Sequence, residues 1–199
     1  MSTQAVGVTD VQATQATWGD AGSGYKILKQ EVGTNVCGPC CAGMVVHLLR
    51  KQEPRIDQLV TIGNLMGVKG GWNANGSNAA YVIALLKAYG VTARLVTGAT
   101  EMKSALQQST ARTPRIAMVQ LPTSLTKNTS GYHWVVFVGR QTNGLRRAST
   151  YTVLDPLSNY KHETEGSRLY TSPIMLRLKS TGQETAVTGH FQKVICCSL

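Results

Sequence analysis

The sequence predicts an α+β fold in which helices of the first half pack against an antiparallel sheet formed by the second half. Between residues 37 and 107, apolar residues recur at helical intervals in several short stretches. From residue 115 onward, the apolar pattern becomes that of strands. The pair Asn143-Gly144 between two of these strands is a strong signal for a β-hairpin. With 199 residues, of which 42% are hydrophobic, the chain can bury one substantial core.

Residues 1–24 are expected to form a flexible leader or linker, and residues 25–199 a single domain. The first stretch is rich in Ser, Thr, Gln, Gly and Ala and has no apolar periodicity. It lacks the basic start and apolar middle of a secretory signal, so Sec export is not indicated. No part of the chain approaches the roughly 20 apolar residues of a membrane span, so we expect none.

The first helix is expected to begin at Cys37, because Cys41, Met44 and Leu48 follow it at helical intervals. Pro39 suits a first helical turn, where its missing N–H would have no partner in the helix. A thiol at this position faces free backbone N–H groups and the positive end of the helix dipole, and both stabilise a thiolate. Cys37 is therefore the candidate nucleophile.

Asp57 is expected to cap a second, short helix that Gly67 ends. The following residues, 69–76, hold so much Gly and Asn that we expect an irregular loop, suited to lining a cleft. Ser77 or Asn78 is then expected to cap a third helix, whose apolar stripe is typical of core packing.

The rest of the chain reads mainly as strands, apart from one short helix that is expected to begin at Thr100. The expected strands are residues 91–96, 115–121, 133–139, 151–155, 174–178 and about 191–197.

One expected strand opens with His133, and the next one along the chain closes with Asp155. If they pair antiparallel about Asn143-Gly144, the start of the first meets the end of the second, and the numbers of paired residues sum to about 287 or 288. This register places Asp155 near His133, Val153 near Val135, and Tyr151 near Phe137. The strand alternation then puts all six side chains on one face.

The pattern therefore brings a carboxylate beside an imidazole. A nucleophilic cysteine needs a histidine to hold its proton, and that histidine needs a third group to fix its tautomer and orientation. Cys37, His133 and Asp155 supply these three groups. A lone strand histidine is more often a core residue with satisfied hydrogen bonds, but a carboxylate neighbour and a helix-start cysteine favour catalysis.

The chain resembles the papain-like cysteine peptidases, and among them the double-glycine peptidases that trim bacteriocin leaders. The resemblance covers residues from about 25 to 160. It rests on Gln30 ahead of Val36-Cys37-Gly38-Pro39, on the Gly-rich 70–76 loop before a helix that ends in Tyr89-Gly90, on His133-Trp134-Val135-Val136 and on Leu154-Asp155-Pro156.

The resemblance implies a papain-like fold and a thiol peptidase with a Cys-His-Asp triad that needs neither a cofactor nor a metal. It also implies that Gln30 donates a side-chain hydrogen bond to the oxyanion. Family members usually place this glutamine about six residues before the cysteine, whereas here the difference is seven, so Asn35 is the alternative donor. The residues expected to contact a substrate with small residues such as Gly-Gly are Gly70, Gly71, Trp72 and Trp134.

Other chemistries remain open on the same residues. The triad would also serve a glutamine deamidase or an acyl transferase, and the fold could have become a binding module without activity. Cys37-Gly38-Pro39-Cys40 matches the sequence motif of a thioredoxin-type redox pair. Such a motif follows a buried strand, however, and the stretch before Cys37 is polar. A zinc site that includes Cys196-Cys197 is disfavoured because paired short spacings are missing. Cys40 is expected to pack within the helix, or else to trap an oxidised Cys37.

The net charge of +10 favours an acidic partner, and no nucleic-acid motif accompanies the scattered basic residues. Five cysteines, two adjacent pairs among them, form a poor disulfide framework and fit a reducing compartment. Leader-processing members of the family are usually fused to membrane transporters, whereas in this chain we expect no transporter and no membrane span, and its polar N-terminal stretch suits joining a delivery module. We therefore expect a bacterial effector or toxin used in bacterial competition. It would be delivered by a specialised secretion system, would act in the cytoplasm of the target cell, and would be held in check by an acidic immunity protein.

Overall fold

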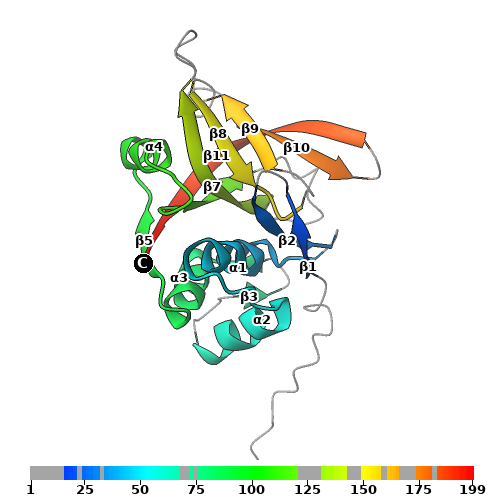
Figure 1. Cartoon of the computed structure of the whole chain (residues 1–199), viewed down its shortest axis with the longest axis vertical. Coiled ribbons are helices and arrows are strands. Elements are labelled where there is room, and N and C mark those ends of the chain that lie inside the picture. Colours follow the sequence, from blue (N-terminus) through cyan, green and yellow to red (C-terminus); the bar gives the residue numbers. More distant parts are fainter. Residues whose placement is uncertain are drawn as a thin grey trace, which may run out of the picture.

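The computed structural model describes residues 16–21, 24–31, 34–67, 72–73, 76–120, 131–142, 149–157, 161–165, 174–180 and 183–199. Helices α1, α2 and α3 gather below an antiparallel sheet, and α4 lies beside the sheet (Figure 1). The helices are α1 (Cys37–Arg50), α2 (Ile56–Leu65), α3 (Ala79–Ala88) and α4 (Ala99–Gln107). The mixed α+β class predicted from the sequence is confirmed.

The strands form one large sheet and two small hairpins. The seven-stranded sheet has the order β10-β11-β6-β7-β8-β9, and β5 pairs with the end of β11. Its strands are β5 (Thr92–Val96), β6 (Arg115–Gln120), β7 (Tyr132–Thr142), β8 (Ser149–Leu154), β9 (Lys161–Glu165), β10 (Ile174–Ser180) and β11 (Gln183–Ser198). The hairpins are β1 (Ala16–Asp20) with β2 (Lys26–Gln30), and β3 (Trp72–Asn73) with β4 (Gly76–Ser77).

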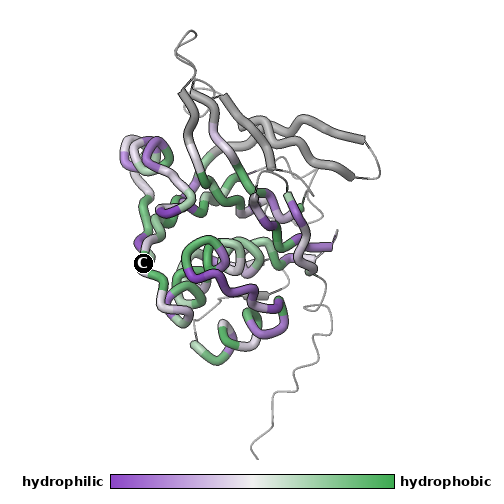
Figure 2. Tube along the Cα trace, viewed as in Figure 1, coloured by the Kyte–Doolittle hydropathy of each residue, from purple (hydrophilic) through white to green (hydrophobic). Residues whose placement is uncertain are grey.

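The central strands are apolar on both faces because each face packs against its own core. In β7, Trp134, Val136 and Val138 belong to the core that contains α1 and α3. Val135 and Phe137 point the other way, into a second core with residues of α4. Figure 2 shows hydrophobic residues along α1 and along the sheet strands that face it. The sheet is therefore a central layer, and both cores depend on β7.

Helix α1 lies at the centre of the molecule. Its first ten residues, 37–46, are all buried, and it contacts β7, β2 and α3. The helix ends at Lys51, which adopts a left-handed backbone conformation with φ of 58° and donates its N–H to the carbonyl of His47. Burial on all sides fixes the direction of α1, so the position of its first residue, Cys37, is fixed as well.

Two predicted helix caps have different outcomes. Asn78 caps α3, because its side-chain oxygen accepts a hydrogen bond of 2.9 Å from the N–H of Tyr81. The prediction that Asp57 caps α2 is wrong, because that helix already begins at Ile56. The carboxylate of Asp57 instead pairs with the guanidinium of Arg55 at 2.7 Å.

The structure places a strand within the stretch that was expected to be a leader. Strand β1 pairs with β2, and Trp18 on β1 donates a hydrogen bond of 3.2 Å to the carbonyl of Pro54. The centroid of the Trp18 ring also lies 5.4 Å from the centroid of the His47 ring on α1. Residues 16–20 are therefore part of the packed structure, while the domain boundary at residue 24 otherwise stays a prediction.

Compared with paired numbers that sum to 288, the register of β7 and β8 is shifted by two residues before a bulge and by three beyond it, although the predicted faces are correct. Val136 pairs with Leu154 and Phe137 with Val153, and a bulge follows between Phe137 and Gly139. A shift of two keeps each side chain on its face, because the side-chain period of a strand is two. The predicted turn at Asn143-Gly144 lies outside the described residues.

Candidate active site

Cys37 is the first residue of α1, and only 6% of it is exposed. The preceding residue, Val36, makes no side-chain hydrogen bond to the helix. Its carbonyl accepts a hydrogen bond from the N–H of Cys40. The side chain of Val36 therefore caps none of the first-turn N–H groups next to the thiol. This helix end offers hydrogen-bond donors and a positive dipole to any negative charge that forms there.

His133 and Asp155 form a hydrogen-bonded pair in which Nε2 of the imidazole lies 2.7 Å from Oδ1 of the carboxylate. The two residues are 2% and 0% exposed. Oδ1 also accepts a hydrogen bond of 2.9 Å from the N–H of Leu157, which holds the carboxylate in place after β8 ends. The predicted proximity of His133 and Asp155 is confirmed.

The His133 ring also makes a side-chain hydrogen bond with Cys37. Because Asp155 occupies Nε2, Nδ1 is the ring nitrogen that remains for the thiol. Burial lowers the pKa of His133, but the charge of Asp155 and the hydrogen bonds with Asp155 and Cys37 outweigh it and raise the pKa to about 10. The ring is therefore a cation at neutral pH, next to the thiol of Cys37.

Gln30 closes strand β2 and is 3% exposed. Its Nε2 donates a hydrogen bond of 3.1 Å to the carbonyl of Thr34, in the segment that leads into α1. Its backbone N–H donates to the carbonyl of Pro156 at 2.9 Å, which joins β2 to the turn after Asp155. Gln30 thus connects the segments that carry the cysteine and the carboxylate, while partly exposed Asn35 lies between Thr34 and α1.

Of the four residues predicted to contact substrate, the structure describes the side chain of Trp134 alone. Gly70 and Gly71 lie outside the described residues, and for Trp72 only the backbone is described, in the β3–β4 hairpin. That hairpin corrects the expectation that residues 69–76 contain no regular element. Trp134 is 1% exposed, and its indole N–H donates to the carbonyl of Ser77 at 3.0 Å. Trp134 is therefore a core residue behind the site and not the substrate contact that the sequence predicted.

The other cysteines are also described, and all five thiols are free. Cys40 and Cys41 are completely buried within α1, and burial raises the pKa of both thiols well above the usual value, with a further contribution from nearby Cys37. Burial likewise raises the pKa of Cys197 to about 12. Cys196 is partly exposed on β11. Among the described residues, no group of three or more His, Cys, Asp and Glu is arranged to hold a metal ion.

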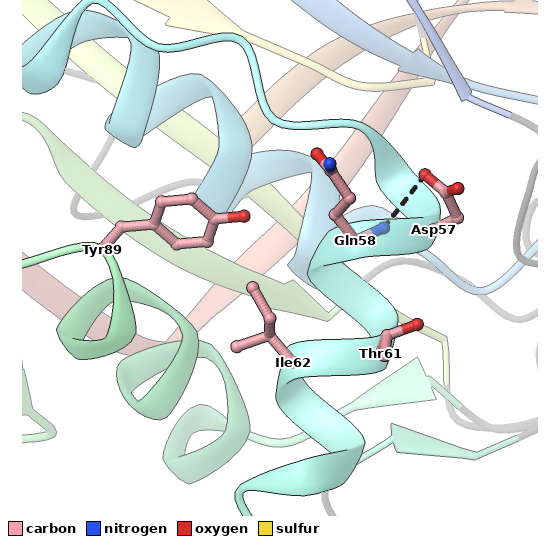
Figure 3. Close-up of a pocket in the computed structure, with 5 residues that line it drawn as sticks. All are labelled: Asp57, Gln58, Thr61, Ile62 and Tyr89. Atoms are coloured by element: carbon pink, nitrogen blue, oxygen red, sulfur yellow. Dashed lines mark hydrogen bonds between the residues drawn. The ribbon is translucent and has the colours of Figure 1, made fainter.

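A hollow elsewhere on the molecule contains none of the predicted site residues. It is lined by Asp57, Gln58, Thr61 and Ile62 of α2 and by Tyr89 at the end of α3. Figure 3 shows the Tyr89 ring directed toward α2, where Asp57 accepts a hydrogen bond of 3.0 Å from the N–H of Gln58. Cys37, Gln30, His133 and Asp155 lie instead on α1, β2, β7 and just after β8, and the candidate active site is the place where these elements meet.

None of the described helices is long and apolar enough to cross a membrane. No protein-family model matches the chain, and a search of curated proteins found no match.

Solved structures are similar to this one across most of the chain. One is the peptidase domain of Streptococcus ComA, a bifunctional ABC transporter involved in a quorum-sensing pathway, with a TM-score of 0.54, 17% identity, and coverage of 86% of this chain and 97% of that chain. Another is a double-glycine motif protease from an AMS/PCAT transporter in complex with its leader peptide, with a TM-score of 0.48, 15% identity, and coverage of 95% and 94%. The papain-like α+β fold that the sequence predicts is thus confirmed, and the ComA peptidase domain shares it.

Proposed function

We propose that this protein is a cysteine peptidase that cleaves a peptide bond with Cys37 as nucleophile, His133 as general base and acid, and Asp155 as the group that orients the histidine. The observation that carries the proposal is the contact of one buried imidazole with two partners. Its Nε2 lies 2.7 Å from Asp155, and the ring also bonds to Cys37 at the start of a helix. This constellation suits thiol-based acyl transfer.

In the proposed reaction, His133 holds the proton of Cys37, and the thiolate attacks the carbonyl carbon of the scissile peptide. The tetrahedral oxyanion accepts hydrogen bonds from first-turn N–H groups of α1 and from Nε2 of Gln30, whose second hydrogen is not used by Thr34. His133 then donates its proton to the leaving amine, and a thioester forms. Water, deprotonated by His133, attacks the thioester and releases the acid and the thiol.

Asp155 acts in this scheme through the imidazole alone. Its Oδ1 fixes the tautomer in which Nε2 carries a proton, which leaves Nδ1 to exchange the proton with the thiol. The charge of Asp155 is also the largest influence that raises the pKa of His133. The carboxylate therefore keeps the imidazolium available for protonation of the leaving group.

The test of this function compares wild-type protein with Cys37→Ala and with Cys196→Ala as the matched control, because Cys196 is the partly exposed cysteine on β11. New peptide N-termini should appear in a bacterial lysate with the wild type and the control, and should be missing with Cys37→Ala. Intact masses separate the alternatives, since a gain of about one dalton without fragments marks glutamine deamidation, whose product replaces an amide with an acid. Cleavage by clean Cys37→Ala protein would refute the proposal.

For substrate choice, we propose small residues such as Gly-Gly on the acyl side of the cut, a preference supported by the resemblance of the sequence to double-glycine peptidases. A narrow cleft would exclude larger side chains by steric overlap. The test is a peptide panel in which Gly-Gly is replaced by Ala-Ala or Leu-Leu. Equal cleavage of the Leu-Leu peptide would reject the preference.

We propose further that the peptidase is a bacterial effector that acts in the cytoplasm of a target cell and is inhibited by an acidic immunity protein. The net charge of +10 supports an acidic partner, because opposite charges speed association. Expression of the wild type in bacterial cytoplasm should arrest growth, whereas Cys37→Ala should not. Harmless expression of a demonstrably active enzyme would refute the effector role and leave the peptidase proposal intact.

A further inference from the structure

Ser77 stands between the strand that carries His133 and the helix that carries Cys37. Its backbone carbonyl accepts the hydrogen bond of 3.0 Å from the indole of Trp134, the residue after His133. Its hydroxyl lies against the α-carbon of Gly38, the residue after Cys37, so closely that a Cβ added to Gly38 would be 1.9 Å from Ser77 Oγ. One residue therefore touches the immediate neighbours of both proposed catalytic groups.

Toward the described residues, the hydroxyl of Ser77 makes a packing contact and no hydrogen bond. Oγ is buried, and among the described residues no hydrogen-bond partner reaches it. A buried polar atom without a hydrogen-bond partner is unfavourable, so another contact of the Ser77 hydroxyl must account for it. That contact is the close packing against Gly38, because only glycine at position 38 leaves room for the hydroxyl.

We propose that Ser77 is a positioning residue that sets the distance between the Cys37 thiol and the His133 ring. The inference rests on the peptidase function proposed above. Gly38 of helix α1 packs against the Ser77 hydroxyl, and Trp134 of β7 donates a hydrogen bond to the Ser77 carbonyl. Because proton transfer between thiol and imidazole needs hydrogen-bond distance, a small shift of either element lowers the rate.

The two contacts lead to a compensation experiment. Gly38→Ala places a methyl group on the hydroxyl and should lower kcat about 10- to 100-fold with little change in KM, because misplacement by about 1 Å can cost that much. Ser77→Ala removes the hydroxyl but keeps the carbonyl that Trp134 uses, and should lower kcat by several-fold. In the double variant, the new methyl fills the vacated space, with Ser77 Cβ and Val82 Cγ2 each at 3.1 Å. The double variant should therefore have a higher kcat than either single variant.

Gly43→Ala is the matched control on the same helix. Its added Cβ would meet Leu28 Cδ2 at 2.9 Å and Leu59 Cδ1 at 3.0 Å, so the same helix is also crowded, less tightly than at Gly38 and away from its first turn. This variant should lower the melting temperature and leave kcat unchanged. A loss of kcat in Gly43→Ala as large as in Gly38→Ala would assign the effect to general crowding of α1 and overturn the proposal.

A second readout needs no peptide substrate, so it remains valid if the peptidase function fails. The rate of Cys37 alkylation by iodoacetamide at mildly acidic pH reports the thiolate that His133 maintains. It should fall in both single variants and recover in the double variant, with Cys196 as the internal reference. Unchanged alkylation and kcat in folded Ser77→Ala protein, or a double variant no better than Gly38→Ala, would overturn the role of Ser77. Recovered alkylation without cleavage of any peptide would refute the peptidase function alone.

Discussion

The imidazole of His133 reaches the carboxylate of Asp155 at 2.7 Å, although the two residues are not directly opposite each other in the sheet. Val136 pairs with Leu154, so a continuation of the same register sets Asp155 beside Val135, on the face that also carries His133. The pair is thus a diagonal contact at the place where β8 ends. The carboxylate can take this position because the chain turns at Pro156 and Leu157, where Asp155 accepts the Leu157 N–H.

The first prediction concerns Asp155. Asp155→Asn removes the charge that raises the pKa of His133 and should lower kcat by about 10²- to 10⁴-fold, because the ring loses its preferred tautomer and its imidazolium form. The pH at which the remaining activity falls on the alkaline side should also move downward. A pH profile of kcat/KM for both proteins measures this shift, and an unchanged alkaline limb would contradict the role given to Asp155.

The second prediction concerns the alkaline limit of the wild type. The pKa of His133 is raised to about 10, so the protein should lose kcat/KM as the pH rises through that value, because neutral imidazole cannot protonate the leaving amine. A raised histidine pKa stabilises the fold fully below the unfolded-state pKa of about 6.5, and the contribution is lost as the pH rises through the folded pKa. Urea titrations from pH 6 to 11 should therefore show this contribution to stability declining between about pH 6.5 and about pH 10 and levelling off above it. His133→Gln should lack that part of the decline.

The third prediction orders the cysteines by reactivity. Cys37 should react fastest with iodoacetamide at mildly acidic pH, since the His133 cation lies beside it. Cys40, Cys41 and Cys197 should react last, because burial both shields them and raises their pKa. Peptide mapping after a short exposure measures the order. Equal labelling of Cys37 and Cys196 would favour a binding module without catalytic activity.

The sequence alone predicted those parts of the site that depend on local periodicity. The helix start at Cys37 followed from helical spacing, and the shared face of His133 and Asp155 followed from strand alternation around a hairpin. The exact register did not follow, because a bulge near Gly139 leaves no signature that distinguishes it from a longer turn. Faces are more predictable than partners, because a shift of two residues preserves them.

Features that depend on distant contacts were missed or misassigned. Residues 1–24 were predicted to form a flexible leader or linker, yet β1 forms within them. The Trp18 ring packs on His47, and its indole N–H donates a hydrogen bond to the carbonyl of Pro54, and no local sequence pattern encodes these contacts. Trp134 was expected to contact substrate, but it lies in the core that contains α1, on the face of β7 opposite Val135. The contact of Ser77 with Gly38 arises only when β4 meets α1.

The fourth prediction tests the hairpin that β1 adds to the domain. Trp18→Ala removes a partly buried ring and its hydrogen bond to Pro54, and should lower the free energy of unfolding by about 2 kcal/mol. Trp18→Phe keeps the ring but loses the hydrogen bond, and should cost about half as much. Chemical denaturation with a common m-value measures both. An unchanged stability in Trp18→Ala would show that the strand contributes nothing to the fold.

The last prediction separates Gln30 from Asn35 as the side chain that stabilises the oxyanion. Gln30 is buried at the end of β2, its Nε2 uses one hydrogen on Thr34, and its backbone is tied to the turn after Asp155. Removal of one oxyanion donor lowers kcat by about 10²- to 10³-fold, so Gln30→Ala should show that loss with KM little changed, while Asn35→Ala should stay close to the wild type. Gln30→Glu keeps the size but turns a donor into an acceptor and should be at least as inactive. The reverse order, with Asn35→Ala the inactive protein, would assign the donor to the segment beside Cys37 and leave Gln30 the role of joining β2 to Pro156.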